Sequence, residues 1–85
     1  MTRSLGSLEQ NIAEQIRKAI VEKLPGAVVD VSGAGGHFTL VVKSEQFAGK
    51  TPLAAQRLVY SAIAPLMAGE GAPVHAIDNL KTIVE

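Results

Sequence analysis

Hydrophobic residues recur every four positions in the first third of the chain, which is the spacing of one face of an α-helix. The repeated positions are Leu8, Ile12, Ile16, Ile20 and Leu24. A proline and a glycine follow directly, and this pair ends a helix because proline lacks the amide hydrogen and glycine accepts positive φ. The pattern predicts an amphipathic helix whose whole apolar stripe faces the core.

The next two segments, residues 27–32 and 37–43, place apolar side chains at every second position, the period of a strand with one buried face. These positions are Val29, Val31, Phe38, Leu40 and Val42. Residues 33–36 between the segments read Gly-Ala-Gly-Gly. A glycine-rich linker of this kind supplies the positive φ angles of a tight turn, so we expect a β-hairpin closed by these four residues.

A second helix is predicted to begin at Thr51 and Pro52, a capping residue followed by proline at the first helical position. We expect it to end near Gly69. Its apolar stripe is Ala55, Leu58, Val59, Ala62, Ile63, Leu66 and Met67. An extra helical turn is expected at residues 45–47, and the apolar residues 74–80 predict a third strand.

These elements give the order α-β-β-α-α-β in a single domain that spans residues 1–85. Two helices can cover only one face of a three-stranded sheet. We therefore expect a two-layer α+β sandwich in which the other face of the sheet is partly exposed to solvent. The long connection before the last strand allows it to lie parallel to the second strand, which makes the sheet mixed. His37 and His75 should then lie at the same end of the sheet, beside the glycine turn.

Composition narrows the function classes. A chain of 85 residues buries only about 60% of its unfolded surface, so a deep enzymatic cleft is not expected. Eight basic residues balance eight acidic ones, so the net charge is zero. A domain without net positive charge has no long-range electrostatic attraction to nucleic acid or to an anionic membrane. No apolar run approaches the ~20 residues of a membrane span, and residues 1–6 lack the apolar core of a secretory signal. We therefore expect a cytoplasmic protein without membrane contacts.

The chain contains no cysteine, so it has no thiolate to act as a nucleophile or a metal ligand. The two histidines are the remaining soft-metal ligands, and two imidazoles give only half of a tetrahedral zinc shell. Taken alone, a single histidine is more often a strand residue with a backbone partner than a metal ligand. Aspartate and glutamate residues are present, but no spacing groups a carboxylate with a histidine and a nucleophile.

Three short motifs resemble those of the BolA family. They are Phe47-Ala48-Gly49-Lys50, Arg57-Leu58-Val59-Tyr60 and Val74-His75-Ala76, in the family's order and close to its spacing. Residues 31–38, which read Val-Ser-Gly-Ala-Gly-Gly-His-Phe, are similar to the hairpin of the IbaG (YrbA) branch. The resemblance covers about residues 8–80 and implies a class II KH-like fold and a non-enzymatic role in iron–sulfur assembly or iron sensing.

The resemblance also implies a partner and a cofactor. BolA proteins pair with monothiol glutaredoxins, and a [2Fe-2S] cluster is then held by the glutaredoxin cysteine, glutathione and BolA-side ligands. Carried over to this chain, the ligands are His75 and, as a second candidate, His37. The expected partner-binding residues are Gly35, Gly36, Phe47, Gly49, Lys50, Arg57 and Tyr60.

The chain departs from the family pattern in two places. Ala55-Gln56-Arg57 stands where the family has a basic R-H-R triplet, which makes the alternative function, a KH-like nucleic-acid-binding regulator, the weaker prediction. Residues 81–85, which read Lys-Thr-Ile-Val-Glu, carry no counterpart of the family's T-P-x-E-W ending. We expect that part of the partner surface to differ.

Overall fold

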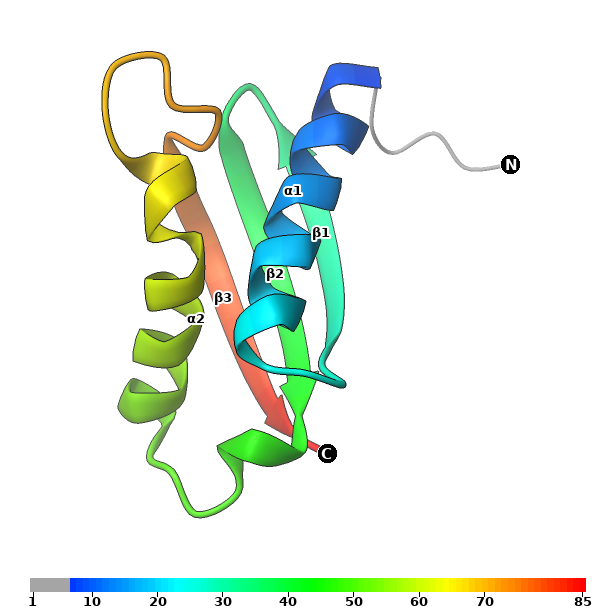
Figure 1. Cartoon of the computed structure of the whole chain (residues 1–85), viewed down its shortest axis with the longest axis vertical. Coiled ribbons are helices and arrows are strands. Elements are labelled where there is room, and N and C mark those ends of the chain that lie inside the picture. Colours follow the sequence, from blue (N-terminus) through cyan, green and yellow to red (C-terminus); the bar gives the residue numbers. More distant parts are fainter. Residues whose placement is uncertain (1–6) are drawn as a thin grey trace.

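The computed structural model describes residues 7–85, in which two helices lie on one face of a three-stranded sheet (Figure 1). Residues 1–6, examined above for a secretory signal, lie outside the described part. The elements are α1 (Ser7–Lys23), β1 (Val28–Ala34), β2 (His37–Ser44), the 3₁₀ turn η1 (Glu45–Phe47), α2 (Pro52–Met67) and β3 (Ala76–Val84). This order confirms the predicted two-layer α+β architecture, including the extra helical turn.

The sheet has the strand order β1-β2-β3, with β2 in the centre. β1 pairs with β2 antiparallel and β3 pairs with β2 parallel, as the sequence predicted. The parallel pairing requires the chain to return to the end where β2 began, and α2 makes that return (Figure 1). The starts of β2 and β3 therefore meet at one end of the sheet.

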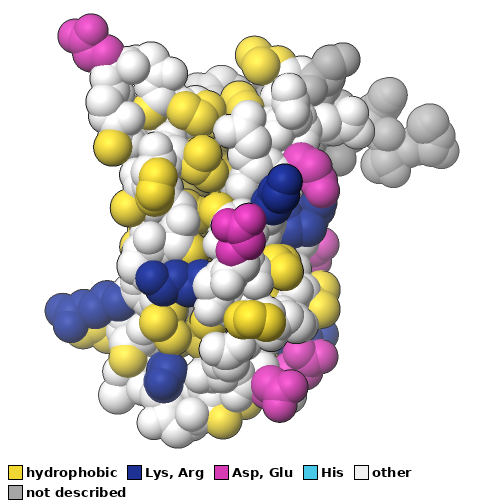
Figure 2. Space-filling view, viewed as in Figure 1, with side chains coloured by type: hydrophobic (Ala, Val, Ile, Leu, Met, Phe, Trp, Pro, Cys, Tyr) yellow, Lys and Arg dark blue, Asp and Glu magenta, His cyan; other side chains and the backbone are white. Residues whose placement is uncertain are grey.

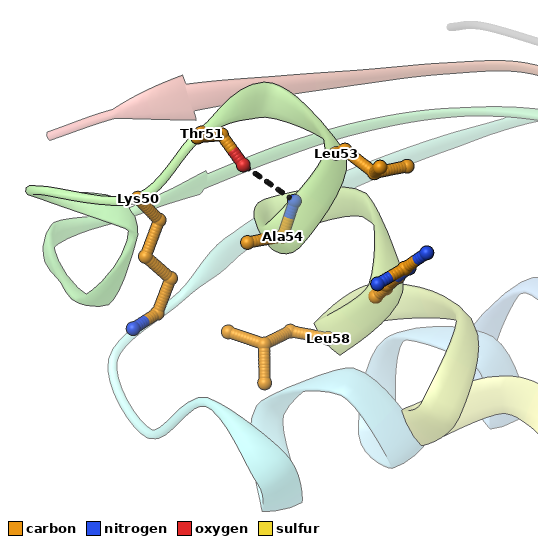
Figure 3. Close-up of a pocket in the computed structure, with 6 residues that line it drawn as sticks. Lys50, Thr51, Leu53, Ala54 and Leu58 are labelled. Atoms are coloured by element: carbon orange, nitrogen blue, oxygen red, sulfur yellow. Dashed lines mark hydrogen bonds between the residues drawn. The ribbon is translucent and has the colours of Figure 1, made fainter.

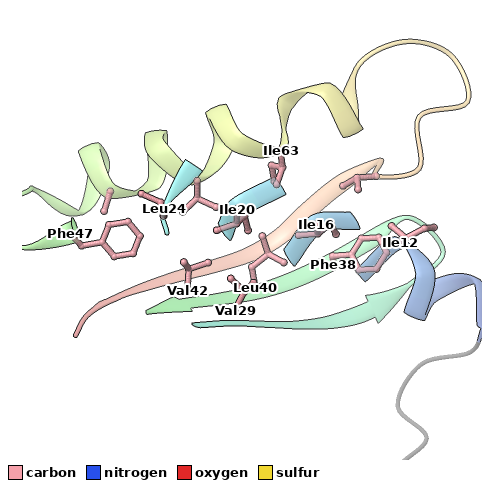
Figure 4. Packing of buried hydrophobic residues seen from close by; sticks show 13 residues of the cluster. Ile12, Ile16, Ile20, Leu24, Val29, Phe38, Leu40, Val42, Phe47 and Ile63 are labelled. Atoms are coloured by element: carbon pink, nitrogen blue, oxygen red, sulfur yellow. The ribbon is translucent and has the colours of Figure 1, made fainter. Parts of the chain in front are cut away.

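The core lies between the helices and the sheet (Figure 4). Phe38, Leu40 and Val42 of β2 are all buried, so the predicted alternation is confirmed. The helices contribute Ile12, Ile16, Ile20, Ala55, Val59 and Ile63 to this core cluster. Leu8 departs from the predicted stripe: its side chain is 66% exposed, because the first turn of α1 extends past the end of the strands that bury the later turns.

The hairpin turn is shorter than predicted. β1 continues through Gly33 and Ala34, which pair with Phe38 and His37, so the turn consists of Gly35 and Gly36 alone. Their φ angles of 66° and 83° are both positive, as a two-residue turn matched to the strand twist requires. The prediction counted every residue of the glycine-rich stretch as turn, whereas cross-strand pairing draws the first two into the strand.

The third strand also differs from the prediction of residues 74–80. Val74 and His75 precede β3, and the strand runs on to Val84. The buried Val74 donates its amide hydrogen to the carbonyl of Leu66 at 3.1 Å, so it is tied to α2. The strand extends further because β2 runs to Ser44 and offers a paired edge as far as Val84.

Candidate metal-binding and partner-binding site

The two histidines meet at the end of the sheet where β2 and β3 begin. His37 is the first residue of β2, and His75 lies directly before β3. Their ring centroids are 6.5 Å apart and the ring planes stand at 83° to each other. Both residues are exposed. The prediction that the two imidazoles lie at the same end of the sheet is therefore confirmed.

The backbone of the hairpin turn fixes where His75 lies. The carbonyl of Gly36 accepts hydrogen bonds from the amides of His75, at 2.8 Å, and of Ala76, at 3.0 Å. Gly36 is buried, and a Cβ at this position would lie 2.7 Å from Nδ1 of His75. The imidazole of His75 thus packs directly on the glycine, which leaves no room for a side chain there. A Cβ at Gly35, by contrast, would meet nothing within 4 Å among the described residues.

His37 has an acidic neighbour that the sequence did not reveal. Its Nδ1 lies 3.1 Å from Oδ1 of Asp78, and both side chains are more than half exposed. Asp78 is the extra residue of a β-bulge in β3, because Phe38 pairs with Ile77 whereas Thr39 pairs with Asn79. The contact depends on this bulge and joins residues 41 positions apart, so the sequence carried no signal for it.

A hollow of about 500 Å³ adjoins His75. It lies between the first turns of α1, the hairpin turn and the loop before β3, and its lining includes Leu8, Ile12, Gly35, Gly36 and Pro73. Leu8, which the sequence assigned to the core, therefore presents an apolar surface near His75. The two glycines predicted to contact a partner also lie here.

The other predicted contact residues lie toward the opposite end of the sheet, where α2 begins (Figure 1). Phe47 is 1% exposed and belongs to the core, so its ring cannot contact a partner, and its prediction as a contact residue is corrected to a structural role. Gly49 adopts a φ of 78° in the turn that leads to α2. Lys50 and Arg57 are exposed, and Tyr60 is 40% exposed.

A second hollow, of about 400 Å³, lies along the start of α2 (Figure 3). Lys50 and Arg57 line it together with Leu53, Ala54 and Leu58. Thr51 caps the helix, because its Oγ1 accepts a hydrogen bond from the amide of Ala54 at 3.1 Å. Tyr60 is not among the lining residues. The predicted residues therefore lie mainly in two groups, one at each end of the sheet, and Tyr60 lies midway along α2.

Comparison with known proteins identifies the family. The sequence model of the BolA-like protein family matches residues 10–84. The chain belongs to the BolA-like family. It is 38% identical, over 66 residues, to an uncharacterised protein of the rpoN-murA intergenic region of Acinetobacter guillouiae, an alignment that covers 76% of each chain.

Solved structures of BolA-like proteins share the fold. A BolA homologue from Coxiella burnetii superimposes with a TM-score of 0.68 at 35% identity, over 82% of this chain and 86% of the other. Yeast Fra2 superimposes with a TM-score of 0.60 at 28% identity, over 98% of this chain and 83% of the other. These similarities confirm the family and its fold, whereas the assignment to the IbaG branch stays a prediction.

The donor set of this BolA-like chain can be compared with what a [2Fe-2S] cluster needs. Such clusters are normally held by four thiolates, and in Rieske centres two histidines replace two of them on one iron. The chain provides two exposed imidazoles at one site and no cysteine. Within residues 7–85, no group of three or more histidine, aspartate or glutamate residues is arranged to hold a metal ion. The imidazole pair thus fits half of a cluster's ligands.

The charged surface of the BolA-like fold is mixed. The helix-covered face carries side chains of both signs (Figure 2). Arg17 forms an ion pair with Glu14 on α1.

Of the helices described, none is long and apolar enough to cross a membrane.

Proposed function

We propose that this BolA-like chain is a non-enzymatic adapter that pairs with a monothiol glutaredoxin and shares a [2Fe-2S] cluster with it. Its role would be in assembling or trafficking iron–sulfur clusters or in iron homeostasis. The observation that carries the proposal is the pair of exposed imidazoles, 6.5 Å apart at one end of the sheet, in a chain without cysteine. This donor set can hold a cluster only together with a thiol-bearing partner.

In this proposal His75 and His37 are the ligands from the adapter, and the glutaredoxin cysteine and glutathione supply the thiolates. The cluster is cargo that the two proteins hold between them. Histidine ligation raises the potential of a cluster relative to thiolate ligation, so the shared cluster would be easier to reduce than one held by thiolates alone. The Gly36 carbonyl supports His75 through two amide hydrogen bonds, which keeps the ligand in place before the partner arrives.

The hollow beside His75 supplies the adjoining partner surface. Leu8 is the exposed apolar residue of this surface, and the exposed Gly35 provides backbone that a partner can approach closely. An apolar residue next to the metal ligands favours docking, because burying it keeps water away from the cluster. Lys50 just before α2 and Arg57 and Tyr60 within it lie away from the histidines and would form a second contact region.

A second candidate function is binding of nucleic acid through a KH-like surface. The observation that favours it is the hollow at the start of α2, where Lys50 and Arg57 flank apolar residues. Two cations support only a weak phosphate interaction, and the net charge of the chain is zero. We therefore rank this function below the adapter role.

The proposed pairing can be tested with the purified chain and a monothiol glutaredoxin that carries a glutathione-ligated cluster. We expect a heterocomplex on size-exclusion chromatography whose visible absorption and circular dichroism differ from those of the glutaredoxin alone. The double variant His37→Ala/His75→Ala should lose this spectral change, and Lys43→Gln, at an exposed residue of β2, should keep it. If the wild-type chain leaves the spectrum of the glutaredoxin unchanged, the proposal is wrong.

A further inference from the structure

We propose that Asp78 is a positioning residue that fixes His37 with its Nε2 atom as the metal-binding nitrogen. The inference rests on the proposed function and deepens it. Asp78 touches His37 and acts through it. The bulge in β3 and the atoms that meet at His37 support this role.

The β-bulge lets two successive residues of β3 face the open side of the sheet. Ile77 pairs with the buried Phe38, and Leu80 pairs with the buried Leu40, so both pack against the core. Strict alternation would send residues 77 and 80 to opposite faces. The extra residue resolves this conflict, because Asp78 and Asn79 are then both exposed while their apolar neighbours stay inside. The bulge thus aims a carboxylate at His37 without opening the core.

The hydrogen bond between the two side chains determines which nitrogen of His37 is free. Nδ1 lies 3.1 Å from Oδ1 of Asp78, and a carboxylate can only accept a hydrogen bond. Nδ1 must therefore carry the proton, and in the neutral ring the lone pair is on Nε2. Histidines that bind metals commonly donate their other ring N–H to a carboxylate, which fixes the tautomer and makes the ligand more basic.

At His75 the neighbouring group is the backbone of the hairpin turn, which restricts the ring by packing. Its Nδ1 edge lies against Gly36, where a Cβ would approach within 2.7 Å of Nδ1 and 2.8 Å of Cγ. Both imidazoles thus have a group of this chain close to Nδ1, the carboxylate of Asp78 at His37 and the backbone of Gly36 at His75. At His37 the hydrogen bond leaves Nε2 as the nitrogen that can bind a metal.

The first test needs only the isolated chain. Long-range ¹H–¹⁵N NMR at a pH where the imidazoles are neutral should show the His37 proton on Nδ1 in the wild type. Asp78→Ala should shift His37 toward the Nε2–H form, and Asp78→Asn should retain part of the effect because its amide oxygen still accepts. Asp30→Ala, which removes an exposed carboxylate from β1, should leave His37 unchanged.

The second test uses the glutaredoxin complex. Asp78→Ala should weaken cluster retention against a chelator by about 10–100-fold, the usual effect of removing a partner of a metal ligand. A wild-type His37 protonated on Nε2 would overturn the positioning role, and so would an Asp78→Ala complex that matches wild type while His37→Ala does not. A complex that responds to neither variant would instead show that His37 is not a ligand, which is a failure of the proposed function.

Discussion

At the end of the sheet where β2 and β3 begin, the predicted site residues His37 and His75 are exposed, and main-chain or surface contacts hold them. At the opposite end, Phe47 is buried, and Ser44 and Thr51 cap the helices that follow them. The 16 residues of α2 separate the two ends by about 24 Å. The histidine end therefore presents exposed side chains, whereas much of the motif at the start of α2 stabilises the fold.

This difference explains why family motifs can mislead about contact residues. The Phe47-Ala48-Gly49-Lys50 motif contains one core residue, one turn glycine and one exposed cation. The motif around His75 is mixed in the same way, because Val74 is buried and the histidine beside it is exposed. Variants at the two ends should thus separate loss of stability from loss of binding.

The largest effect on stability is expected at the end of the sheet near the start of α2. Phe47→Ala should lower the free energy of unfolding by about 3–5 kcal/mol, since it removes a fully buried aromatic ring and leaves a cavity. Urea denaturation followed by far-UV circular dichroism measures the loss. Leu53→Ala, at a residue that is 56% exposed in the first turn of α2, is the control and should change stability by no more than about 0.5 kcal/mol. Equal stability of Phe47→Ala and wild type would mean that the two ends do not differ as described.

An intermediate effect is expected in the hairpin turn. Gly35→Ala places a side chain at φ 66° in open space and should cost about 1–2 kcal/mol. Gly36→Ala adds a clash with the His75 ring and should cost about 1–3 kcal/mol more. Urea denaturation gives the difference, and the NMR shifts of the His75 ring should move in Gly36→Ala but not in Gly35→Ala. Identical behaviour of the two variants would contradict the packing of His75 on Gly36.

The smallest effect concerns nucleic acid. The isolated chain should bind duplex DNA or RNA no more tightly than the non-specific range of about 10⁻⁴ to 10⁻⁶ M at physiological salt. Lys50→Gln/Arg57→Gln should reduce the salt dependence of this binding by a log–log slope of at most about 2, because each phosphate contact contributes about 0.9. Fluorescence anisotropy over a salt series measures both values, with Lys81→Gln in β3 as the control. Sequence-selective nanomolar binding would favour the KH-like function instead.

The sequence predicted what short-range periodicity and motif order determine. The alternation in β2 and the stripe of α1 from Ile12 onward gave the layers, and the crossover through α2 gave the meeting of His37 and His75. The limits of the turn and of β3 depend on pairing with β2, which no local pattern records. Asp78 was missed for the same reason, since its contact with His37 exists only because β3 bulges beside the start of β2.

The central claim is that the exposed histidines bind a shared cluster and contribute little to the fold. Removing the exposed imidazole of His75 should change the free energy of unfolding by no more than about 0.5 kcal/mol, so the variant stays folded. His37→Ala should alter the cluster less than His75→Ala, and it provides the comparison within the same site.

The most direct measurement is visible circular dichroism with redox titration of reconstituted glutaredoxin complexes that contain wild type, His37→Ala or His75→Ala. The account predicts that His75→Ala loses the cluster or shifts its spectrum and potential, because a thiolate or water would replace an imidazole that raises the potential. A His75→Ala complex whose spectrum and potential match those of wild type would contradict the account.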